Sequence, residues 1–71
     1  MKVKNIVGTG SYDVFINNVE SYEIYNGSED VGYAYWQITK VSKNFPYREV
    51  IDVVDSFKDA KQFIKEIEGV A

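Results

Sequence analysis

The C-terminal segment constrains the fold most, because it predicts an amphipathic helix from Ser56 to about Glu68. Ser56 is a favourable N-cap residue, and Asp59 three positions later completes a variant of the capping box. Apolar residues recur at spacings of three and four on one face, with Phe63 at its flank: Phe57, Ala60, Ile64 and Ile67. Gly69 suits the left-handed position that ends a helix. A helix of this length is not stable alone, so its apolar face must pack on another element.

The residues before this helix predict a sheet. Four segments alternate polar and apolar side chains or are rich in β-branched and aromatic residues: 12–16, 19–25, 33–41 and 48–54. Asn17 and Asn18 tolerate positive φ and predict a tight hairpin turn between the first two segments. Residues 2–7 are a candidate for one more strand. Gly8-Thr9-Gly10 predicts a turn between strands and not a phosphate-binding loop, because such a loop requires a helix directly after the glycines and a strand follows here. Residues 26–30 and 42–46 are expected to form polar loops.

Strand alternation assigns two faces to the expected sheet. In the segment 33–41, Trp36 and Ile38 share the face expected under the helix, whereas Tyr33 and Tyr35 share the wetter face. In the segment 48–54, Ile51 and Val53 are expected to share one face. Neighbouring segments usually pair in space. The expected fold is therefore α+β, an antiparallel β-meander of three to five strands packed under one C-terminal helix, about 56–68, with residues 1–71 forming a single domain.

Composition removes several kinds of chemistry. The 71 residues include neither cysteine nor histidine, which excludes disulfides and thiol nucleophiles and removes the commonest general base and metal ligand. Asp52, Asp55 and Asp59 surround the helix start, where negative charge is favourable, and their spacing matches no calcium loop. We therefore expect a protein that is not an enzyme and holds no cofactor or metal. With no signal peptide and no apolar run of about 18 residues, we expect it to be cytoplasmic and not embedded in a membrane.

Tyrosine is unusually abundant, with six residues in a chain that is 15% aromatic. Aromatic residues fill small cores, but they also dominate protein interfaces, and the sequence leaves both roles open. The candidate partner-binding residues combine tyrosines with an acidic rim: Glu23, Tyr25, Glu29, Asp30, Tyr33 and Tyr35. Such a surface fits a basic protein partner.

A second hypothesis is nucleic-acid binding by a basic surface made of Lys40, Lys43, Arg48, Lys58, Lys61 and Lys65. The net charge of −3 disfavours it, because neutralisation of phosphates supplies most non-specific affinity. The lysines from 58 to 65 also fit a solvated helix face. A third hypothesis is a homodimer that pairs through an exposed edge strand.

Two resemblances bear on function. Residues 33–67 combine an aromatic strand, a loop, a second strand and a helix opened by Ser-Phe-x-x-Ala-x-x-Phe-Ile. This layout, about half the chain, resembles the AP2-like arm-binding domains of phage-type integrases, which implies DNA contacts from the sheet; the matching positions here include Tyr33, Tyr35 and Gln37. The short, cysteine-free composition is also similar to small phage and mobile-element accessory proteins, including anti-CRISPR proteins. That similarity implies a non-enzymatic binding module that inhibits a host nucleic-acid enzyme, which is our first hypothesis.

Overall fold

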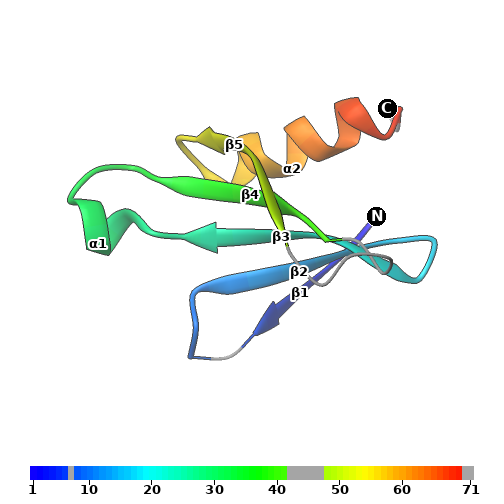
Figure 1. Ribbon diagram of the computed structural model, residues 1–71, viewed down its shortest axis with the longest axis horizontal. Coiled ribbons are helices and arrows are strands. Elements are labelled where there is room, and N and C mark those ends of the chain that lie inside the picture. Colours follow the sequence, from blue (N-terminus) through cyan, green and yellow to red (C-terminus); the bar gives the residue numbers. More distant parts are fainter. Residues whose placement is uncertain (7, 42–47, 70–71) are drawn as a thin grey trace.

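The computed structural model describes residues 1–6, 8–41 and 48–69. Five antiparallel strands form one sheet in chain order: β1 (Lys2–Ile6), β2 (Ser11–Ile16), β3 (Val19–Asn26), β4 (Trp36–Lys40) and β5 (Glu49–Val54). A short helix, α1 (Ser28–Val31), connects β3 with β4, and the C-terminal helix α2 (Phe57–Ile67) lies across one face of the sheet (Figure 1). The expected α+β meander under a C-terminal helix is therefore confirmed, as is the additional strand over Lys2–Ile6.

The two N-terminal turns form as their residue types predict. Asn17 and Asn18 have φ values of 52° and 65°, so the hairpin between β2 and β3 uses the left-handed conformation that asparagine tolerates. Gly8 and Gly10 also have positive φ in the turn between β1 and β2. These turns keep β1, β2 and β3 adjacent in the sheet.

The core lies between α2 and the sheet. Its buried members come from strands β2 to β4 and from α2: Val14, Tyr22, Ile24, Ile38, Ala60 and Ile64. Ile24 pairs directly with Ile38 across β3 and β4. Three rings extend this core, because Phe57 lies 4.5 Å from Tyr12 and 5.6 Å from Trp36 between ring centroids. The prediction that the Trp36 face lies under the helix is confirmed.

The predicted ends of α2 are also confirmed. The Asp59 amide donates to Ser56 Oγ at 3.1 Å, so Ser56 is the N-cap, and Gly69 has a φ of 72° beyond the last turn. The prediction that Ile67 packs on the core is wrong, since its side chain is 49% exposed. A hydrogen bond of 2.5 Å from the Tyr22 hydroxyl to the Glu68 carboxylate holds this end of the helix on the sheet instead.

The predicted faces of the last strand are partly wrong, because a bulge interrupts the alternation. Ile38 pairs with Asp52 but Thr39 pairs with Val50, so one residue of β5 is unpaired. Ile51 and Val54 pack against the core, whereas Val50 and Val53 are 53% and 42% exposed on the other side. Ile51 and Val53 therefore do not share a face.

Two boundaries around α1 also differ from the predictions. Residues 28–31 form a helical turn and not a loop, and Gly32 ends it with a φ of 79°. β4 begins at Trp36 and not at Tyr33, because the backbone of Tyr35 bonds to the start of α1: its amide donates to Ser28 Oγ at 2.9 Å and its carbonyl accepts from the Gly27 amide at 2.9 Å. Within the described ranges, no helix is long and apolar enough to cross a membrane.

Candidate functional site

Helix α2 covers one face of the sheet and leaves the other, which we call the open face, without a second layer in the described part of the chain (Figure 1). Strand register arranges this open face in rows that cross the sheet. One row runs through Lys4, Asp13, Glu23, Thr39 and Val50, and the next runs through Ser11, Tyr25, Gln37 and Val53. The open face therefore carries charged side chains and the Tyr25 phenol on strands whose other face forms the core.

Three of the predicted residues form a cluster that includes Tyr25 of the second row, and we call this cluster the tyrosine shelf: Tyr25, Tyr33 and Tyr35. The rings of Tyr33 and Tyr35 meet edge to face, with centroids 6.3 Å apart and planes at 72°. Tyr33 is 65% exposed, whereas Tyr25 and Tyr35 are half-buried. The Tyr35 hydroxyl donates to Gln37 Oε1 at 3.2 Å, which ties the shelf to the open face. The rings therefore belong to a surface and not to the core.

Gly27 brings two rings of the shelf together. It is buried, and a Cβ atom there would lie 2.9 Å from Tyr35 Cδ1 and 3.1 Å from Tyr25 Cε2. Only a residue without a side chain lets both rings approach the backbone this closely. The shelf therefore depends on a glycine that separates β3 from α1.

The acidic residues beside the shelf come from α1. The Tyr25 hydroxyl donates to Asp30 Oδ2 at 2.7 Å, and this hydrogen bond is the main reason that the pKa of the Tyr25 phenol is raised above its ordinary value of 10.0. The negative charge of Glu29 raises it further. Both carboxylates are exposed, so Tyr25 lies beside two solvent-accessible negative charges.

A polar hollow of about 290 Å³ adjoins the shelf. Its lining joins the turn between β1 and β2 to the end of β3 and to α1: Gly8, Thr9, Gly10, Tyr25, Asn26, Glu29 and Asp30. In the described part of the chain, neither lysine nor arginine lines it, so the negative charges of Glu29 and Asp30 face a concave surface without a counter-charge from those residues.

Glu23 is less closely associated with the shelf than the other predicted residues. It lies two positions before Tyr25 on β3, so both face the open side, but it forms an ion pair with Arg48. Its charge is therefore already matched within the chain. The structure brings together five of the six predicted residues, with Glu23 at the margin in a charge pair.

The predicted basic residues are distributed over both sides of the sheet. Arg48 is on the open face in its ion pair with Glu23, whereas Lys40 alternates with Thr39 toward the helix side. Lys58, Lys61 and Lys65 lie on α2, where the Lys61 ammonium is 4.7 Å from the centroid of the Phe57 ring. Lys43 lies outside the described residues. The described members therefore do not all lie on one side of the sheet.

A pair of carboxylates occupies the open face near the β2–β3 hairpin. Desolvation raises the pKa of Glu20 above its ordinary value of 4.5, and a hydrogen bond with Asp13 raises it further.

Among the residues that the structure describes, no group of three or more acidic side chains is placed to hold a metal ion. Asp52 instead accepts a hydrogen bond from the Val53 amide at 2.8 Å, and thereby occupies one backbone donor of the edge strand β5.

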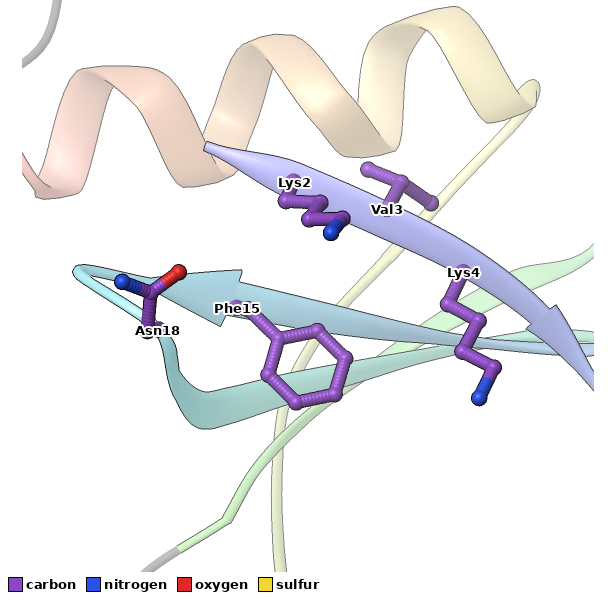
Figure 2. A pocket seen from close by; sticks show the side chains of 5 residues that line it. All are labelled: Lys2, Val3, Lys4, Phe15 and Asn18. Carbon is purple, nitrogen blue, oxygen red and sulfur yellow. The ribbon is translucent and has the colours of Figure 1, made fainter.

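The sequence analysis missed a second hollow, which lies beside the edge strand β1. Its lining residues come from β1 and the β2–β3 hairpin (Figure 2): Lys2, Val3, Lys4, Phe15 and Asn18. The spacing of Lys2 and Lys4 in a candidate strand could have indicated that they share a face. Their proximity to Phe15 depends on strand register, which the sequence pattern alone does not provide.

The comparisons with known proteins add no relative. No family model, no curated protein and no solved structure matches this chain. The functional argument therefore depends on the surfaces of the molecule itself.

Proposed function

We propose that this chain is a non-enzymatic protein–protein binding module that uses the tyrosine shelf and its two neighbouring carboxylates to bind a basic surface of a protein partner. The observation that carries the proposal is the convergence of Tyr25, Tyr33 and Tyr35 with Glu29 and Asp30 at one end of the open face. The finer proposal is that the partner is a host nucleic-acid enzyme inhibited by a phage or mobile-element protein.

The tyrosine shelf consists of a residue type that is typical of the centre of protein interfaces. Tyrosine provides a large contact area with few rotatable bonds, and it is enriched among the residues that contribute most binding energy. The rings of Tyr25 and Tyr35 pack against the backbone of Gly27. Their hydroxyls donate hydrogen bonds to Asp30 and Gln37, respectively, which fixes the orientation of both side chains. A surface that is already ordered loses less conformational entropy when a partner binds.

The charge of the shelf favours a basic partner. Glu29 and Asp30 are exposed, and none of the described cationic side chains lines the hollow between them and the turn at Gly8. Enzymes that act on nucleic acids have basic surfaces for phosphate contacts. An acidic, aromatic surface is complementary to such a site and would accelerate association at low salt.

The test is affinity capture from a lysate of a low-GC bacterium, followed by binding measurements with each purified partner. We expect the double variant Tyr33→Ala, Glu29→Lys to lose the partner, because it removes the most exposed ring and reverses one charge. The matched control is Ile67→Ala, Glu66→Lys, which truncates one exposed apolar side chain and reverses one charge on α2. If the shelf variant retains every partner that the wild type captures, the shelf is not the binding surface.

A homodimer through β5 is the second candidate, because the edge strand exposes Val50 and Val53. Isolated exposed valines are common on monomers, and the Asp52 carboxylate already occupies the Val53 amide. Sedimentation over a concentration series decides this point: a constant monomer mass contradicts the homodimer.

The nucleic-acid alternative through Lys40, Arg48 and the lysines of α2 stays a prediction with a direct test. It requires binding of labelled duplex or single strands that weakens steeply with salt. Charge reversal at Lys58 and Lys65 should abolish such binding if these residues provide the contacts, and unchanged binding contradicts their role.

A further inference from the structure

The hollow beside β1 differs in character from the tyrosine shelf. It has a volume of about 370 Å³, and its lining contains two lysines, one aromatic ring and one amide side chain but, over residues 1–6, 8–41 and 48–69, no carboxylate. Lys2 and Lys4 are two positions apart on β1, so both extend to the open face, and Lys2 pairs with Phe15 across β1 and β2. Figure 2 shows the Phe15 ring between Asn18 and Lys4, whereas Val3 extends the other way, toward α2.

The two ammonium groups are available to a ligand. Lys2 and Lys4 are exposed, and among the described residues neither has a carboxylate within ion-pair distance, the ion pair there being that of Arg48 with Glu23. Lys4 pairs with Asp13 in the strand register, but no ion pair forms between them. Two neighbouring ammonium groups suit a ligand with two negative charges, and a lysine ammonium binds phosphate as a point charge.

Phe15 and Asn18 add an aromatic ring and an amide group to the two lysines that line the hollow. Phe15 is half-buried on β2, opposite the bulge that leaves one residue of β3 unpaired, so the strand holds its ring while part of the ring remains accessible. An accessible aromatic ring on a sheet is a stacking surface for a planar base. Asn18 is exposed in the hairpin turn with a φ of 65°, and its amide offers both a donor and an acceptor to a base edge.

We propose that this hollow binds a phosphorylated planar ring, the chemistry of a nucleotide unit, with the phosphate between Lys2 and Lys4 and the base stacked on Phe15. Free mononucleotides and single strands both present this unit. The site is at the opposite edge of the sheet from β5 and shares no residue with the tyrosine shelf, so it is independent of the proposed protein-binding function.

The test is a titration of the full chain at low salt, followed by amide NMR, with three probes: adenosine monophosphate, adenosine and inorganic phosphate. We expect saturable binding of the monophosphate, at least about tenfold tighter than that of either fragment, because only the monophosphate uses both halves of the site. The shifted amides should include those of Lys2, Lys4, Phe15 and Asn18. Absence of saturation up to about 10 mM overturns the proposal, as does a shift map centred elsewhere.

Variants separate the two halves of the site. The double variant Lys2→Gln, Lys4→Gln should raise the dissociation constant of the monophosphate about tenfold, whereas the control Lys58→Gln, Lys65→Gln removes the same charge from α2 and should leave it unchanged. Phe15→Leu, which keeps an apolar side chain, should weaken binding of adenosine and leave that of phosphate unchanged. If the two lysine doubles behave alike, binding is non-specific and the proposal is wrong.

A short single-stranded oligonucleotide distinguishes the two sources of the ligand. Affinity well above that of the monophosphate, lost in the Lys2→Gln, Lys4→Gln variant, supports the hollow as one unit of a strand-binding surface. Equal affinity supports a free nucleotide as ligand. Failure of both ligands to bind overturns the proposal.

Discussion

The two faces of the sheet use the same strands for opposite purposes. On β3, Tyr22 and Ile24 are buried under α2, whereas Glu23 and Tyr25 alternate with them on the open face. Among the described residues, the fully buried large side chains all belong to the covered side of the sheet or to the helix above it, including Ile24, Ile38 and Ile64. The comparison shows that one face provides stability and leaves the other free to carry charges and phenols.

The two faces should differ most in how much the truncation of one side chain lowers the free energy of unfolding, and the loss should be larger in the core. We expect Ile38→Ala to lower the free energy of unfolding by about 2–5 kcal/mol, because it removes a fully buried side chain and leaves a cavity. A domain of this size has only about 3–5 kcal/mol from a single core, so the variant should be largely unfolded. Urea titration measures the effect.

The control for this truncation is Val50→Ala on the open face, which should change the free energy of unfolding by no more than about 0.5 kcal/mol. Equal losses in the two variants would show that both faces contribute to the stable core.

Gly27→Ala tests whether the shelf depends on close packing against the backbone. Gly27 has a φ of −100°, which alanine adopts without strain, so the cost comes from the contact with the Tyr35 ring. We expect a loss of about 1–2 kcal/mol and displaced ring signals of Tyr25 and Tyr35 in NMR spectra.

Gly32→Ala is the contrasting variant, since Gly32 has a positive φ and open space around it. It should lose stability through the backbone of α1 without displacing either ring. Unchanged ring signals in Gly27→Ala would contradict the packing argument.

Tyr22→Phe tests the hydrogen bond that holds the end of α2 on the sheet. Its loss should cost about 1 kcal/mol at neutral pH. Burial, together with the hydrogen bond to Glu68, raises the pKa of Tyr22 from 10.0 to about 12. The folded state therefore binds the phenolic proton more tightly than the unfolded state, and this stabilisation is complete below pH 10 and lost as the pH rises to about 12.

The variant should remove that part of the alkaline loss of stability, which urea titrations from pH 9 to 12 would measure. Tyr33→Phe, a change at an exposed ring, should keep the wild-type profile. An identical alkaline profile in Tyr22→Phe and the wild type would contradict the argument.

The smallest expected effect is on the open face, at Glu20. The pKa of Glu20 is raised above 4.5 in the folded state, so the folded protein binds this proton more tightly than the unfolded chain does. The resulting stabilisation is complete below pH 4.5 and is lost as the pH rises through the folded-state pKa. Glu20→Gln should therefore stabilise the protein at pH 7, by at most about 0.5 kcal/mol on a solvated surface, and have no effect below about pH 4. Thermal unfolding at the two pH values checks the difference, with Glu66→Gln on α2 as control.

Short-range chemistry was sufficient to predict several features. The Ser56 N-cap, the Gly69 end of α2 and the Asn17–Asn18 turn depend on neighbouring residues, and each formed as expected. The placement of Trp36 and Ile38 on the face under the helix followed from strand alternation. All three residues of the tyrosine shelf were also among the predicted candidates, because they are close together in the chain.

The features that the sequence did not reveal depend on strand register and on contacts between distant segments. The bulge in β5 places Val53 on the face opposite to Ile51. The pairing of Lys2 with Phe15 brings together the residues that line the second hollow. The ion pair with Arg48 neutralises the charge of Glu23, one of the predicted site residues. A one-residue shift in register moves a side chain to the other face, and no local pattern specifies such a shift. The residue types of this protein therefore define its turns, its helix and two chemically different faces, whereas the packed sheet decides which charges are paired and which remain available to a ligand.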